Sequence, residues 1–119
     1  MPLEAVNPDR LDVLRRLGTP DDLLLTRVVR AFVDVGPARV SAIRASAQGG
    51  DSAALADAAH LLLGAAATVG ATAVVDLCCQ LDAMGRRADL TGAAELVDRL
   101  AAEMSRAEVE LNRAVAAAR

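Results

Sequence analysis

Apolar residues recur three or four positions apart along almost the whole chain, and only short joints interrupt the pattern. This spacing places the apolar side chains on one face of a helix. The joints at Gly70 and at 85–89 are so short that the helices on either side must be antiparallel neighbours. The pattern therefore predicts an all-α fold, an up-and-down four-helix bundle with a short additional N-terminal helix.

The composition favours the same fold class. Apolar residues make up 54% of the chain and aromatic residues 1%, with neither Tyr nor Trp. A chain rich in Ala and Leu and poor in aromatic side chains forms helices more readily than strands. Because 119 residues are enough for one hydrophobic core but not for two, we expect a single domain over 1–119, with its core at about 7–113.

Start and stop signals divide the first half of the chain into two helices. Asn7-Pro8-Asp9 is typical of a helix start, and Gly18 follows that first helix. Thr19-Pro20-Asp21-Asp22 repeats the start signal, and Gly49-Gly50 closes the second helix. Gly36-Pro37 lies inside it, which indicates either one bent helix or two collinear ones.

Three further helices fill the second half. Asp51 or Ser52 is expected to cap the third helix, and Gly70 to end it in the left-handed conformation. Thr72 is expected to cap a fourth helix that Gly85 closes. Asp89 or Thr91 is expected to open the last one, whose apolar stripe consists of Leu96, Leu100, Met104, Ala107, Leu111 and Val115.

The charges and cysteines exclude several classes of function. The net charge is -3 and every basic residue is Arg, without a dense cationic stripe, so no nucleic acid partner is expected. The adjacent Cys78 and Cys79 can neither pair in an ordinary disulfide nor bind a metal together, which suits a reducing cytosol. We see no apolar run long enough to cross a bilayer and no signal peptide. The expectation is a cytoplasmic protein without a membrane partner.

His60 is the one histidine of the chain, and its helical position is unusual. At about 100° per residue, the side of the third helix opposite His60 is apolar and forms the expected core face, with Leu55, Ala58, Leu62, Ala65, Ala66 and Val69. Small or apolar residues also surround His60 itself: Ala56, Leu63, Gly64 and Ala67. This arrangement predicts an exposed imidazole within a flat apolar docking surface. The alternative is that small residues lie there by chance in an Ala-rich chain.

Other chemistries for His60 have little support in the sequence. A metal site needs several converging ligands, and no second histidine is present. A Cys-His nucleophilic pair lacks a loop that could form an oxyanion hole. An enzyme with a metal or cofactor in the bundle core likewise lacks ligands, so no cofactor is expected.

Asp82 is the candidate partner of the imidazole. If the turn centres on Gly70-Ala71, His60 and Asp82 lie nearly level across the helical hairpin. The carboxylate of Asp82 could then accept a hydrogen bond from Nδ1 of His60, which would leave Nε2 as the nucleophile. The alternative is a solvated Asp at the edge of the core.

The run from Ala59 to Ala71, together with Cys78, Leu81-Asp82 and Gly85, resembles the signature of histidine-containing phosphotransfer (HPt) domains. Phe32, Gly50-Asp51 and the closing helix also fall where that family has them, so the likeness covers roughly Asn7 to Leu111.

The resemblance implies a function in a two-component phosphorelay. It implies that His60 is the phosphoacceptor, that Gly64 leaves room for an incoming domain, and that Asp82 takes the place of the family's Glu or Gln beside the histidine. The implied partner is a receiver domain of a response regulator or hybrid histidine kinase, docked over Ala56, Leu63, Gly64 and Ala67. Such a chain is a substrate of phosphoryl transfer rather than an enzyme.

Leu63 departs from the family pattern, which typically has Lys there, and Ala65 replaces a small polar residue. An ammonium group would offset the charge of a phosphohistidine, and Leu cannot. Arg86 and Arg87 are candidates for supplying that charge from the next helix, unless they are simply solvated. The departure also supports an alternative function, a degenerate interaction module or scaffold that binds a receiver or kinase without phosphotransfer.

Overall fold

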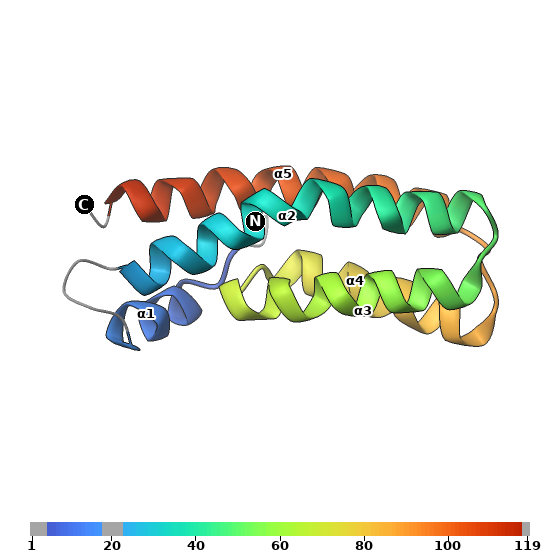
Figure 1. Ribbon diagram of the computed structural model, residues 1–119, viewed down its shortest axis with the longest axis horizontal. Coiled ribbons are helices and arrows are strands. Elements are labelled where there is room, and N and C mark those ends of the chain that lie inside the picture. Colours follow the sequence, from blue (N-terminus) through green and yellow to red (C-terminus); the bar gives the residue numbers. More distant parts are fainter. Residues whose placement is uncertain (1–4, 18–22, 118–119) are drawn as a thin grey trace.

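The computed structural model describes residues 5–17 and 23–117, which form five helices and no strand. The helices are α1 (Pro8–Leu17), α2 (Leu23–Gln48), α3 (Ser52–Val69), α4 (Thr72–Arg87) and α5 (Ala93–Ala117). Figure 1 shows α2 beside α5 and α3 beside α4, with α1 across one end. The predicted bundle with an additional N-terminal helix is confirmed. The predicted start signal at 19–22 lies outside the described residues.

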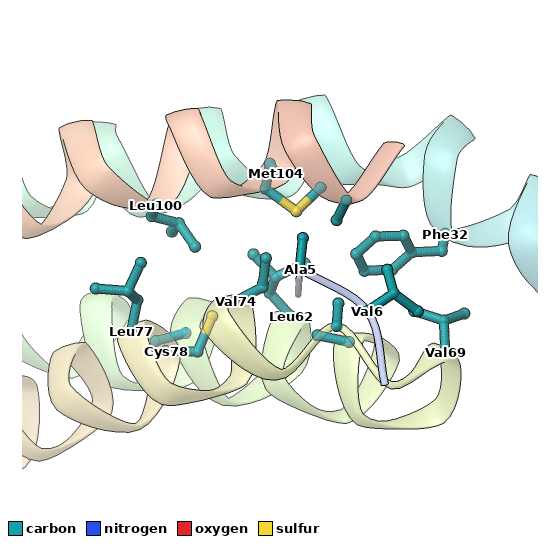
Figure 2. Packing of buried hydrophobic residues seen from close by; sticks show 14 of the residues in the cluster. Ala5, Val6, Phe32, Leu62, Val69, Val74, Leu77, Cys78, Leu100 and Met104 are labelled. Carbon is teal, nitrogen blue, oxygen red and sulfur yellow. The ribbon is translucent and has the colours of Figure 1, made fainter. Parts of the chain in front are cut away.

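The core lies between the four long helices and consists of aliphatic and sulfur-containing side chains together with Phe32 (Figure 2). Ala5 and Val6, which precede α1, are buried in this core, and Val115 near the end of α5 is buried in it as well. The core therefore extends slightly beyond the expected 7–113. The backbone N–H of Asn7 donates to the Gly70 carbonyl at 2.6 Å, which ties the N-terminal segment to the α3–α4 turn.

Helix α3, which carries His60, begins and ends where the sequence indicates. The Asp51 side chain accepts a hydrogen bond from the Ala54 N–H at 3.1 Å and caps the first turn. Gly70 ends the helix with φ 73°. A Cβ at Gly70 would lie 2.7 Å from Cβ of Arg10, so this position needs glycine for space as well as for conformation.

Helix α4 differs from the prediction at both ends. Thr72 is its first helical residue rather than its cap, and the preceding Ala71 makes no side-chain cap bond. The helix continues through Gly85 to Arg87 and ends at Ala88, which adopts φ 55°. Gly85 is instead buried against α3, where a Cβ would lie 2.6 Å from the Ser52 carbonyl oxygen. Gly85 thus serves close helix packing, not helix termination.

Helices α2 and α5 show smaller differences. α2 is continuous through Gly36-Pro37 and bends partway along (Figure 1), in agreement with the bent-helix alternative. α5 begins at Ala93, after the expected Asp89 or Thr91. The Asp89 side chain accepts a hydrogen bond from the Thr91 N–H at 3.1 Å and so organises the loop before the helix instead of capping it.

One expectation about membranes was too strict. Helix α3 is long and apolar enough, by length and composition, to cross a bilayer. Much of that apolar character comes from Ala, and α3 packs against both α2 and α4 within the bundle. It also carries Asp57 and His60 on its exposed surface. One third of α3 is buried in the bundle, so burial accounts for only part of its apolar composition.

Candidate functional site

His60 lies near the middle of α3 with its side chain 66% exposed. Its Nδ1 is 3.5 Å from Oδ2 of Asp82, which projects from α4. This distance is at the long end for a hydrogen bond, so the pair is best described as an electrostatic contact. The two residues that the sequence placed level with each other are therefore neighbours in the structure.

Asp82 lies between two cationic or potentially cationic groups. Its other oxygen, Oδ1, accepts a hydrogen bond from Nε of Arg86 at 2.8 Å, one helical turn along α4. The Asp82 side chain is only 14% exposed, whereas those of His60 and Arg86 are 66% exposed. The site is thus a chain of three side chains with the carboxylate in the middle, His60 on Oδ2 and Arg86 on Oδ1.

The two candidate arginines lie on different sides of α4. Arg86 contacts Asp82 beside His60. Arg87 lines an open groove between α4 and α5, together with Glu95 and Arg99. Only Arg86 is therefore brought to the candidate site.

The surface around His60 is flat and mostly apolar. Gly64 and Ala67 are exposed, Leu63 is half-buried, and a Cβ built on Gly64 would meet no atom within 4 Å. Leu61 is 56% exposed, more than any other large hydrophobic residue whose side-chain exposure the structure describes. Leu61 lies about 100° from His60 around the helix, outside the arc taken as the docking surface, so the sequence analysis missed it.

The prediction that Ala56 lies on the open docking surface is wrong, because its exposed fraction is only 7%. It packs under α4, where a Cβ on Gly85 would lie 2.9 Å from Cβ of Ala56. The expected core residues Ala58 and Ala65 are only half-buried, while Ala59 is fully buried. The buried face of α3 is therefore rotated toward α4, because the helix packs against α4 as well as α2.

The cysteines lie apart from any cluster of ligands. Among the residues that the structure describes, no group of three or more His, Cys, Asp or Glu side chains could hold a metal ion. Cys78 and Cys79 are both free thiols, the first buried and the second exposed. Burial raises the pKa of the Cys78 thiol to about 12, which keeps it protonated at neutral pH.

Comparison with known proteins identifies the family. The family model described as Hpt domain matches residues 27–110. The chain belongs to the Hpt domain family. Membership makes it a histidine phosphotransfer protein of the phosphorelay type, and the resemblance based on the run from Ala59 to Ala71 is confirmed.

A solved structure supports the fold of this Hpt protein. The crystal structure of histidine-containing phosphotransfer protein B (HptB) from Pseudomonas aeruginosa PAO1 superposes with a TM-score of 0.85 and 22% sequence identity. The match covers 94% of this chain and 95% of HptB. At this identity the likeness concerns the fold. No match was found among curated proteins.

Proposed function

We propose that this Hpt protein accepts a phosphoryl group at Nε2 of His60 from the aspartyl phosphate of a receiver domain, and donates it to a receiver aspartate in turn. The observation that carries the proposal is the orientation of the exposed imidazole. Nδ1 faces Asp82 at 3.5 Å, and Nε2 has no hydrogen-bond partner among the described residues. The nucleophilic nitrogen is therefore available to a docked partner.

The proposed transfer moves no proton and balances in charge over the two partners together. The lone pair of Nε2 attacks phosphorus, the N–P bond forms, and the P–O bond of the acyl phosphate breaks to release the receiver's carboxylate. The proton on Nδ1 stays in place, so the ring becomes cationic as it accepts the phosphoryl group. The Asp82 carboxylate faces that developing charge. The Mg²⁺ and the Lys that organise in-line transfer belong to the receiver in this proposal.

The proposed docking surface consists of Leu61, Leu63, Gly64 and Ala67 around His60. These residues provide exposed or half-buried apolar area on one helix. Gly64 has no side chain, so it leaves open space beside the imidazole for a partner. The partner is a receiver domain of a response regulator or hybrid histidine kinase. A cytoplasmic location belongs to the same proposal, in keeping with the two unpaired thiols.

A second candidate function is favoured by Leu63 alone. The half-buried Leu63 supplies no charge to offset a phosphohistidine, so a protein that binds receivers or kinases without accepting phosphate is the competing proposal. Both functions use the same docking surface. They differ in whether His60 becomes labelled.

The deciding experiment is transfer of radiolabelled phosphate from phosphorylated receiver domains. We expect an acid-labile, base-stable label on the wild-type chain and none on His60→Gln, which places a polar side chain of similar size at the exposed position. Binding of both proteins to the receiver is measured in parallel. Equal binding with no label on the wild type would establish the binding module and overturn phosphotransfer.

A further inference from the structure

Arg86 contacts the carboxylate of Asp82, which faces His60. Its Nε donates to Oδ1 of Asp82 at 2.8 Å, while Oδ2 lies 3.5 Å from Nδ1 of His60. A short carboxylate at the edge of a helix interface has other staggered conformations, several of which turn it toward water. A hydrogen bond on one oxygen at i+4 restricts that choice and determines where the second oxygen points.

We propose that Arg86 is a positioning residue that acts through Asp82. By holding Oδ1, it keeps Oδ2 beside Nδ1 of His60, which favours the tautomer with the proton on Nδ1 and the lone pair on Nε2. The consequence for transfer rests on the proposed function of His60. The effect on the imidazole itself needs no partner protein.

This role differs from compensation of phosphate charge. In compensation, the guanidinium must be available to the phosphoryl group, and any cation nearby contributes. In the structure the Nε of Arg86 is already committed to Asp82. The positioning role requires a donor at that place and does not require a positive charge.

The same helix contains an uncharged example of this arrangement. Nε2 of Gln80 donates to Oδ2 of Asp76 at 3.1 Å, also at a spacing of four residues. Arg86→Gln should therefore keep a donor on Asp82 while removing the charge. Arg86→Met removes both. Arg87→Met is the matched control, because Arg87 lines the groove between α4 and α5. The residue that contacts Asp82 is Arg86.

The tautomer of His60 is the decisive readout, and a chain with a single histidine gives one unambiguous imidazole signal. Long-range ¹H–¹⁵N correlation on ¹⁵N-labelled protein at about pH 8.5, where imidazoles are ordinarily neutral, measures the ratio of the Nδ1–H to the Nε2–H form. We expect Arg86→Met to lower that ratio by about two- to fivefold, the range of a partly exposed charged contact. Arg86→Gln and Arg87→Met should keep the wild-type ratio.

A double-mutant cycle with Asp82→Ala tests whether Arg86 acts through the carboxylate. We expect Asp82→Ala to lower the ratio at least as much as Arg86→Met, and Arg86→Met to have no further effect in that background. A wild-type ratio in Arg86→Met, or an equal effect with and without Asp82, would overturn the inference. Unfolding in urea confirms that each variant is folded.

The same variants separate this inference from the proposed function. If Arg86→Met changes the tautomer but no receiver labels the wild-type chain, positioning stands and phosphotransfer fails. If receivers label Arg86→Met at the wild-type rate and the tautomer ratio is unchanged, phosphotransfer stands and positioning fails. Loss of transfer in both Arg86→Met and Arg86→Gln, with the tautomer intact, would assign Arg86 to charge compensation instead.

Discussion

Gly85 of α4 lies against Ala56 of α3 so closely that a Cβ on Gly85 would be 2.7 Å from the backbone nitrogen of Ala56. Ala56 comes four residues before His60 and Gly85 three residues after Asp82, so this contact is about one helical turn from the candidate site. The close approach fixes the register of the two antiparallel helices. That register is what sets the Asp82 carboxylate level with the imidazole.

Gly85→Ala is expected to destabilise the protein. The new methyl group would meet the Ser52 carbonyl oxygen at 2.6 Å and the Ala56 backbone, which cannot move without separating the helices. We expect a loss of about 1–3 kcal/mol in the free energy of unfolding, measured in urea. Gly36→Ala is the control, because the Cβ would meet only the flexible end of Met104 and a carboxylate oxygen of Glu108 at 3.8 Å. Equal stability of the two variants would show that α3 and α4 can separate at no cost.

Gly64→Gln should block receiver docking and leave the fold intact. The position is exposed with open space above it, so a long side chain fits the free protein but stands where a partner must approach. We expect receiver binding, measured by calorimetry, to weaken about tenfold or more, with no loss of stability. Gly64→Ala should stabilise α3 by about 0.5–1 kcal/mol and retain most of the binding. Full binding by Gly64→Gln would place the interface elsewhere.

The sequence was sufficient to predict features that depend on one helix or one hairpin. The cap at Asp51 or Ser52, found at Asp51, follows from local signals, as does the left-handed end at Gly70. The pairing of His60 with Asp82 follows from the length of the joint. The burial of Ala56 does not. A helical projection locates one apolar face of a helix. In the bundle, α3 packs against both α2 and α4, so its buried surface depends on the positions of two neighbouring helices.

The C-terminal end of α4 illustrates the same limit of prediction from sequence. Glycine often ends a helix, so the sequence predicts a stop at Gly85, yet tertiary packing is what requires glycine there. The helix ends instead at Ala88, where two backbone bonds, Asp89 N–H to Met84 and Ala88 N–H to Gly85, close the last turn. No propensity rule selects alanine for a left-handed position.

Ala88→Gly is expected to stabilise the protein. Ala88 holds φ 55°, the conformation that glycine adopts without a steric penalty. We expect a gain of about 1 kcal/mol, seen as a higher midpoint of thermal unfolding. Ala102→Gly, at an exposed position in the interior of α5, should lower stability by a similar amount. The same sign of change in both variants would contradict the strain assigned to Ala88.

Leu63→Lys tests the departure from the family pattern. Leu63 is half-buried against the core, so the methylene stem of Lys can keep part of that packing while the ammonium reaches solvent near His60. We expect the phosphorylated state to live several-fold longer or to form several-fold faster, since such a contact contributes roughly 0 to 1 kcal/mol. Leu63→Met changes shape without charge and should leave both rates unchanged. An equal effect of Met and Lys would rule out the charge as the cause.

Cys78 is expected to make the stability of the protein depend on pH in the alkaline range. Burial raises the pKa of its thiol from 9.0 to about 12 in the folded protein. The proton is therefore held more tightly in the folded than in the unfolded state. The contribution to stability is complete below pH 9.0 and is lost as the pH rises from 9.0 toward about 12. We expect a decrease of about 1 kcal/mol per pH unit just above pH 9, because one proton is lost on unfolding.

The composition of the chain simplifies the measurement of stability at alkaline pH. Tyr and Lys, the other side chains that ordinarily lose a proton in this pH range, are both absent from the chain. Urea unfolding at pH 8.0, 9.5 and 10.5 under reducing conditions should show the decrease in the wild type and in Cys79→Ser, whose substitution is at an exposed position. Cys78→Ala should abolish most of it, because no buried thiol remains to be deprotonated on unfolding. A slope that persists in Cys78→Ala would show that another group, such as the terminal amine, is linked to unfolding, and that the buried thiol does not control alkaline stability.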